Sequence, residues 1–588
     1  MKGVDEMKNQ QILLDGILNE YYEESSFRDI DRAFESFATE QIYKYRDLGI
    51  DEINSGLVGD SRDGGADGIY IFLDDELILD IEQIGEKKIH NNSILELNIL
   101  QHKNTNKVEE LVLDRFLGSV DFIYDLSISR DALESVFSEE IIDKIILFHE
   151  CWKKTASKHP KIKVKYSHVC KGNKLKTLGP DLINESYITK RNLLIEKVKR
   201  VSQTISDIQY EIYDANDLLN LYRKKQDYSL EIKLNENPIG IEYQVPGTDT
   251  KQGGYIASVN IRDYNSFIKD GDGLIRKYLF ESNIRDYQNN TEVNKAMQNS
   301  LENEKGYDFW WLNNGVTIIA DKGTLSGKSL HLDNVQIVNG LQTSHNIFMN
   351  EFDDEEKRSL LLKIVVTDDK ETKDAIIKST NSQNYVHPSL FKATDPIQRN
   401  IEDYLLKEDY YYDRRKNFYK NQGKPINSII SINFMAQCIT TIVEKNPSKA
   451  RQSPASLTKQ DKTYDNIFSD SRDLKVYLNS VKLVKMVEKY FKEQFNTTDD
   501  IENNILNNFK FHVARVLMSI LCTKHRYNDN EVKNVKFEEI DASKLNEAIE
   551  LLKEIIIKFR EENTNQNIIN IAKNSSFSEY ITTYLKEN

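Results

Sequence analysis

The sequence has few cysteines, few prolines and no long apolar run. Its 4 cysteines lie far apart without a CxxC pair, which argues against a disulfide framework or a cysteine zinc site. No apolar stretch approaches the roughly 18 residues of a membrane span, and the chain does not start with a basic segment followed by an apolar one. We therefore expect a cytoplasmic protein with ordinary buried thiols and no membrane partner.

The chain is also short of basic charge, with a formal net charge of -15. Counterion release rewards basic surfaces in nucleic-acid binding, so this balance is unfavourable for such a partner. One stretch differs, because residues 151–200 hold fourteen Lys or Arg against three acids. These residues could form a local basic face or an ordinary solvated surface, and the sequence favours neither alternative.

What the chain does have is length and apolar content. At 588 residues it is too long for one core, and 39% hydrophobic residues are enough to bury several. We expect a multidomain α/β plus α protein. The predicted segments are an α/β domain over 1–225, a central α/β module over 226–425 and a helical region over 426–588.

The first domain is organised around two predicted strands. Asp67 opens the apolar strand DGIYIF, and a second strand over 95–103 ends in Gln-His-Lys. Side chains alternate along a strand, so Gln101 and Lys103 emerge side by side. Carboxylate and amide oxygens suit Mg²⁺ or Mn²⁺, and an adjacent lysine can orient water or stabilise a phosphodiester under attack.

These residues, in this order after a helix containing AFESFATEQI, resemble the PD-(D/E)xK nucleases in their Mrr-like form, where Gln replaces an acid. The resemblance implies a restriction-endonuclease-like α/β fold. It places Asp67, Gln101 and Glu35 at a metal, with Glu40 behind Glu35, and gives Lys103 the role of orienting the attacking water. About thirty residues separate Asp67 from Gln101, which requires an inserted hairpin over 74–92. Asp63 competes for the ligand role.

In the rest of this domain, predicted helices alternate with predicted strands. Helical periodicity covers 107–126, 131–158 and 186–204, while KIKVKYSHVCKG and IQYEIYDA alternate as strands do. An Asp-capped helix, DANDLLNLYRKK, follows. Such alternation predicts α/β layering.

The central module carries four motifs, LFESNIRDY, FWWLNNGVTII, VQIVNGLQTS and STNSQN. Together, over about residues 254–468, they resemble the AIPR (abortive infection phage resistance) family, whose members often carry an Mrr-like nuclease domain. The matching positions are Asn283, Arg285, Asn313, Asn314, Gly315, Asn339, Gly340, Gln342, Thr343, Asn381 and Gln383.

NGLQTS is distantly similar to a motif of nucleotide-binding ParB-like folds, and a helix starting near Gln342 would direct free N–H groups at an anion. We expect Asn283, Arg285, Asn313, Asn314, Asn339, Gln342 and Thr343 to contact a nucleotide or nucleic acid. The alternative is an Asn/Gln network that fixes the turns of the module.

Residues 409–424 interleave tyrosines with Arg414 and Arg415, a pattern suited to stacking on bases and meeting phosphates, although half-buried tyrosines would look the same. Beyond Ile426 the apolar periodicity is helical and predicts a bundle.

The favoured function is a bacterial antiphage effector, a Mg²⁺- or Mn²⁺-dependent endonuclease that cuts phage or host DNA under control of the AIPR module. RNA stays an alternative substrate, a nucleotide or phage component is the expected trigger, and a homo-oligomer is expected. The rival hypotheses are a nucleotide or nucleic-acid sensor with a degenerate nuclease domain, kept open by Gln101, and a scaffold that acts by oligomerising.

Overall fold

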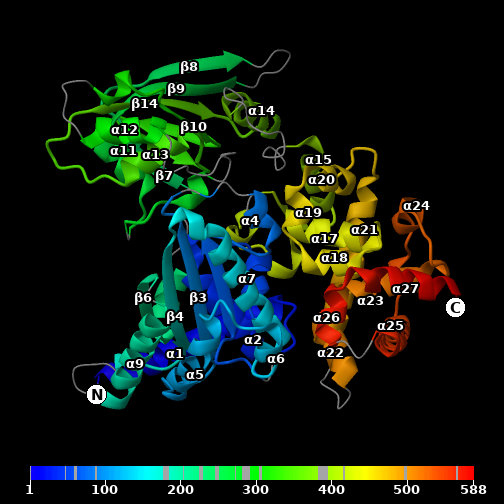
Figure 1. The fold of residues 1–588 in the computed structure, drawn as a ribbon. Helices are drawn as coiled ribbons and strands as arrows, with labels where there is room; N and C mark the ends of the chain where they lie inside the picture. Colours follow the sequence, from blue (N-terminus) through cyan, green and yellow to red (C-terminus); the bar gives the residue numbers. More distant parts are fainter. Residues whose placement is uncertain are drawn as a thin grey trace. The chain divides into compact units, whose positions relative to one another are not determined.

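The structure is a computed structural model. It describes residues 2–46, 48–58, 62–86, 89, 91–175, 184–202, 204–223, 229–244, 251–271, 273–280, 292–302, 308–381, 395–414, 417–494, 500–563 and 567–587. The chain divides into two compact units (Figure 1). Unit 1 comprises Met1–Lys44, Leu48–Lys224 and Asn400–Asn588, and unit 2 comprises Tyr45–Asp47 and Lys225–Arg399.

Unit 1 contains a five-stranded mixed sheet. Its strands are β1 (Gly68–Leu73), β2 (Glu76–Leu77), β3 (Ile94–Lys103), β4 (Lys161–Cys170) and β6 (Ile205–Tyr213), in the order β2-β1-β3-β4-β6. β1 is antiparallel to β2 and β3, whereas β3, β4 and β6 run parallel. The two strands predicted to carry the site are thus neighbours in the sheet.

Helices cover both faces of this sheet (Figure 1). α1 (Lys2–Glu24), α2 (Ile30–Ile42) and α10 (Ala215–Arg223) form one core with Tyr70, Phe72 and Leu100. α5 (Leu111–Ile123), α7 (Glu139–Thr155) and α9 (Glu185–Val201) form the other, with the apolar residues on the opposite side of β1, β3 and β4. The expected α/β layering is therefore confirmed.

Two details differ from the sequence prediction. The predicted single helix over 131–158 is wrong, because α6 (Arg130–Glu134) ends before Ser138, which precedes a separate α7. The insertion over 74–92 is only partly a hairpin: β2 returns beside β1 through Asp74 and Asp75, both at positive φ, and a short helix α4 (Glu82–Glu86) follows. The two aspartates adopt the left-handed conformation that such a tight turn needs.

The C-terminal part of unit 1 is helical, as predicted. Two short strands, β15 (Tyr411–Asp413) and β16 (Ile429–Ser431), pair in parallel near its start, and β16 lies within the region over 426–588 that was predicted to be helical. The helices are α16 (Phe418–Asn421), α17 (Ile432–Ile442), α18 (Pro447–Gln452), α19 (Ser456–Lys459), α20 (Asp461–Ile467), α21 (Leu474–Lys492), α22 (Asp500–Asn508), α23 (Lys510–Cys522), α24 (Asp529–Lys533), α25 (Ala542–Glu562), α26 (Ile568–Lys573) and α27 (Ser575–Glu587).

Unit 2 is mixed α/β. Its larger sheet has the order β13-β10-β14-β9-β8, from β8 (Ile239–Gln244), β9 (Lys251–Asn260), β10 (Val316–Ala320), β13 (Gln336–Asn339) and β14 (Ser359–Val366). A smaller sheet joins β11 (Lys322–Ser326), β12 (Ser329–Asp333) and β7 (Ser229–Lys233). The helices are α11 (Ile261–Ile268), α12 (Glu292–Glu302), α13 (Leu341–Phe348) and α14 (Lys370–Asn381), and α15 (Pro396–Leu406) follows them.

The four cysteines are free thiols, and three of them are buried. Within the described ranges, no helix combines the length and the apolar content that crossing a bilayer requires.

Candidate active site

Asp67 and Gln101 meet across the β1–β3 pairing. Gly68 pairs with Leu100, which places Asp67 opposite Gln101. The amide Nε2 of Gln101 donates to Oδ2 of Asp67 at 2.7 Å, and the backbone N–H of His102 donates to the same oxygen at 2.7 Å. Both side chains are buried, with Asp67 8% and Gln101 0% exposed. Two residues 34 positions apart in sequence therefore form one buried polar pair.

The glycine-rich turn before β1 holds Asp67 in place. The backbone N–H of Gly65 donates to Oδ1 of Asp63 at 2.8 Å, and the backbone N–H of Ala66 donates to the carbonyl of Asp63 at 2.9 Å. Gly65 has φ +86°, and a Cβ there would lie 2.6 Å from Cβ of Arg115, so the turn needs glycine at this position. Asp63, the competing ligand, is thus engaged in shaping the turn.

Lys103 lies at the end of β3 and is half-buried. Its ammonium makes no hydrogen bond or ion pair with any residue the structure describes. Burial raises the pKa of the Asp67 carboxyl, while the charge of Lys103 and the hydrogen bonds from His102 and Gln101 oppose that rise. Lys103 is therefore a cation near the carboxylate that is not bound to it.

Glu35 on α2 is electrostatically coupled to Asp67. Burial raises the pKa of Glu35 to about 7; Arg32 opposes this rise and Asp67 adds to it. Arg32 donates from Nη1 to Oε2 of Glu35 at 2.8 Å, and its two Nη atoms also donate to the carbonyls of Val58 and Leu57. Sequence reasoning missed Arg32, although it precedes Glu35 by three residues, the spacing of a facing pair on a helix.

The donor chemistry fits a hard cation. Burial raises the pKa of the carboxyl groups of both Asp67 and Glu35, and the charge of Asp67 adds to the rise at Glu35, so a divalent ion near them would favour their charged forms. Oε1 of Gln101 is buried and has no hydrogen-bond partner among the described residues, which leaves one more oxygen donor. Three or more His, Cys, Asp or Glu do not gather into a metal-type cluster within those residues, so a cation here would keep several waters.

Other residues of unit 1 with a predicted functional role bind partners within the unit. Glu40 pairs with Lys420. Nε of Arg414 donates to Oε2 of Glu402 at 2.7 Å, and Tyr412 is fully buried. Arg415 lies outside the described residues. The role of Arg414 in nucleic-acid binding stays a prediction.

The basic stretch over 151–200 is partly neutralised by acids from other elements. Lys190 pairs with Glu110 and Asp114 of the α5 region, and Lys197 pairs with Asp121. Lys165, Lys171 and Lys174 likewise pair with Glu211, Asp15 and Asp217. Because these partners come from distant segments, the local count in the sequence overstated the positive charge.

In unit 2 the structure links three of the four motifs, because NGLQTS contacts both NNG and, through Asn339 and Thr380, the start of STNSQN. Nδ2 of Asn313 donates to Oγ1 of Thr343 at 3.0 Å, and the backbone N–H of Gly315 donates to Oδ1 of Asn313 at 2.8 Å. Gly340, at φ +105°, is the N-cap of α13. The motifs NNG and NGLQTS therefore meet through side chains that fix two turns.

The remaining predicted residues of unit 2 are spread around this contact. Asn339 donates from Nδ2 to the carbonyl of Thr380 at 3.3 Å, and the carbonyl of Gln342 accepts from Asn346 at 2.8 Å. Asn314 is exposed, and Asn381 is the last residue of α14. Asn283, Arg285 and Gln383 lie outside the described residues. Ligand binding by this set stays a prediction.

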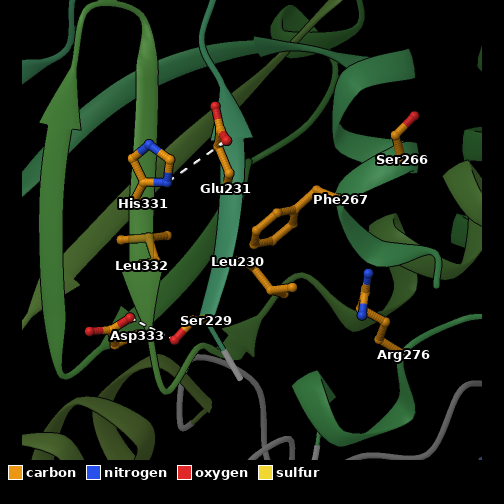
Figure 2. A pocket seen from close by; sticks show the side chains of 9 residues that line it. All are labelled: Ser229, Leu230, Glu231, Ser266, Phe267, Arg276, His331, Leu332 and Asp333. Atoms are coloured by element: carbon orange, nitrogen blue, oxygen red, sulfur yellow. Dashed lines mark hydrogen bonds and ion pairs between the residues drawn. The ribbon is translucent and has the colours of Figure 1, made fainter. Parts of the chain in front are cut away.

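A surface pocket of about 460 Å³ lies elsewhere in unit 2, between the small sheet and α11 (Figure 2). Its walls include Arg276, Phe267 and two cross-strand pairs, His331 with Glu231 at 3.8 Å and Ser229 with Asp333 at 2.7 Å. The predicted nucleotide-contacting asparagines, Gln342 and Thr343 are absent from its described lining.

The comparisons with known proteins give a family match for part of the chain. No curated protein and no solved structure matches the chain. Residues 280–571 match the family model described as AIPR protein, a range that includes the NNG and NGLQTS motifs joined by Asn313 and Thr343. The match supports the AIPR family for this chain, and that family suggests involvement in abortive-infection antiphage defence.

Proposed function

We propose that the chain is a metal-dependent endonuclease acting in antiphage defence, with DNA as its substrate. The observation that supports this most is the buried Asp67–Gln101 pair, beside a lysine that no described residue binds and a second carboxylate coupled to Asp67. Such a set has the oxygen donors and the free cation that phosphodiester hydrolysis requires.

Each residue then has a definite role. Asp67 would hold Mg²⁺ or Mn²⁺, with Gln101 and Glu35 as further oxygen donors. When bound, the metal would supply a nucleophilic hydroxide and neutralise charge on the phosphate. Lys103 would orient the attacking water or stabilise the phosphoryl oxygens. Arg32 would keep Glu35 oriented through their ion pair.

The test is cleavage of plasmid DNA, phage DNA and single-stranded RNA by the purified full-length chain with Mg²⁺ or Mn²⁺. Asp67→Asn and Lys103→Met should each abolish cutting, because one removes a ligand charge and the other removes the cation. Lys107→Met, at an exposed lysine just after β3, is the matched control and should cut normally. Equal cleavage by all three variants would place the chemistry elsewhere.

A nucleotide or nucleic-acid sensor with a degenerate nuclease domain is the second candidate. The contacts within the cluster favour it, because they form without a metal. Arg32 neutralises the charge of Glu35, and the amide nitrogen of Gln101 donates a hydrogen bond to Asp67. On this hypothesis the AIPR region binds the trigger, and wild-type protein cuts nothing with any divalent metal and with any added nucleotide.

A further inference from the structure

One buried histidine next to the candidate active site has no assigned role. His168 lies on β4, and the parallel pairing of β3 with β4 places it beside Gln101. Paired residues direct their side chains to the same face of a sheet, so His168 and Gln101 share one face. Both side chains are 0% exposed.

Each of these two side chains has one unsatisfied atom. Nε2 of His168 and Oε1 of Gln101 are buried without a hydrogen-bond partner among the described residues. A buried polar atom without a partner costs about 1–3 kcal/mol, so two at paired positions call for a common explanation. Buried water is the usual partner of such atoms, provided that the site offers it several polar groups.

The other ring nitrogen of His168, Nδ1, is held by a hydrogen bond to a tyrosine. Nδ1 lies 3.1 Å from the hydroxyl of Tyr187 on α9, and that hydroxyl lies 2.6 Å from the hydroxyl of Tyr210 on β6. Burial, with a smaller effect of the nearby Lys103, lowers the pKa of His168 to about 4. The imidazole therefore stays neutral at neutral pH and keeps one N–H donor and one acceptor, with Nε2 facing away from the tyrosines.

We propose that His168 is a positioning residue of the candidate active site: its Nε2 and Oε1 of Gln101 share one ordered water. That water would fix the amide of Gln101, and the amide in turn holds the carboxylate of Asp67. Partners behind a metal ligand orient it, and losing one commonly costs 10–100-fold in metal affinity or activity. This inference rests on the proposed nuclease function.

The two amide replacements of histidine separate this role from a purely structural one. His168→Gln keeps a polar group near the position of Nε2, whereas His168→Asn keeps one near Nδ1, which contacts Tyr187. We expect His168→Gln to bind Mn²⁺ within about threefold of wild type, and His168→Asn to lose about tenfold. His149→Gln is the matched control, because His149 is also buried but its Nε2 contacts the carbonyl of Ile123 at 2.8 Å.

Mn²⁺ binding is measured by electron paramagnetic resonance on the full-length protein, and cleavage of plasmid DNA is measured in parallel. We expect His168→Asn to lower kcat about tenfold while KM for DNA stays unchanged.

Equal Mn²⁺ affinity in the Asn and Gln variants, or better binding by Asn, would overturn the inference. Wild-type protein that binds Mn²⁺ but cuts nothing would refute the nuclease function while the binding test still decides the role of His168. Absence of Mn²⁺ binding in wild type overturns both.

Discussion

Asn313 and Thr343 join two motifs of the AIPR region, since the amide of Asn313 donates to the hydroxyl of Thr343 at 3.0 Å. Asn313 comes just before β10, and Thr343 lies in the first turn of α13. The carbonyl of the same amide accepts from Gly315, so Asn313 bonds on both sides. This network is the structural alternative to a ligand site, and the two hypotheses predict different consequences of mutation.

Thr343→Val tests the structural role. The change keeps the shape of the side chain but removes the hydroxyl that accepts from the half-buried amide of Asn313, so we expect a loss of about 1 kcal/mol in the free energy of unfolding. The measurement is urea unfolding followed by tryptophan fluorescence, because Trp310 and Trp311 both lie in unit 2. Thr324→Val, at an exposed position of β11, is the control and should shift the midpoint little. An unchanged midpoint in both variants would favour a ligand role for Thr343.

Gly340→Ala should be more damaging than the same change at another left-handed glycine. At Gly340 (φ +105°) an added Cβ would lie 2.7 Å from Cγ2 of Val316, whereas at Gly327 (φ +63°) it would meet nothing within 4 Å. Left-handed strain alone costs about 1–2 kcal/mol, and forced repacking adds about 1–3 kcal/mol. Thermal unfolding of the two variants should therefore give a clearly lower midpoint for Gly340→Ala. Equal midpoints would mean that β10 shifts at Val316 to make room for the new methyl group without a loss of stability.

Gln101→Glu should make the protein depend on a divalent metal for stability. Two buried carboxylates would then face each other, so we expect a loss of about 2–3 kcal/mol in EDTA and a partial recovery in Mg²⁺. Gln209→Glu is a close control, because Nε2 of Gln209 also donates to an aspartate, Asp207, at 2.8 Å but on an exposed part of β6. Differential scanning fluorimetry with and without Mg²⁺ measures both. If Mg²⁺ leaves the midpoint of Gln101→Glu unchanged, the cluster does not hold a cation.

Much of this site could be predicted from local patterns. Alternation along β3 placed Gln101 and Lys103 on one face, and the glycine-rich turn marked the start of β1. The pairing of Asp67 with Gln101 could not be derived in the same way, because the register between β1 and β3 is set across the intervening insertion. Family resemblance supplied that link where local physics did not.

Arg32 could have been found from its spacing to Glu35, whereas two other features depend on contacts between elements. In the sequence His168 is one residue of an alternating strand, and only the β3–β4 register places it beside Gln101. The lysines and arginines over 151–200 are visible in the sequence, but their acidic partners, such as Asp114 and Asp121, come from α5. Contacts between elements therefore account for these two features, while most strands, helices and turns could be predicted, with the helix over 131–158 as an exception.

Glu488 predicts how the helical part responds to acid. It is 9% exposed on α21 and pairs with Lys485 at 3.1 Å and with Lys510 at 2.5 Å. Burial alone would raise the pKa of Glu488, but the two lysines outweigh it and lower the pKa to about 2. Because the folded-state pKa lies below the ordinary value of 4.5, this carboxylate stabilises the protein above about pH 4.5 and loses that contribution as the pH falls toward about 2.

Glu488→Gln should therefore lower the free energy of unfolding by about 2 kcal/mol near neutral pH and flatten its decline in acid. Urea unfolding at several pH values between about 6 and 3 measures both effects. Glu547→Gln, at an exposed position of α25, is the control, and its free energy of unfolding should change with pH as that of wild type does. A difference between Glu488→Gln and wild type that stays constant down to pH 3 would contradict the depressed pKa and reduce the effect to lost packing.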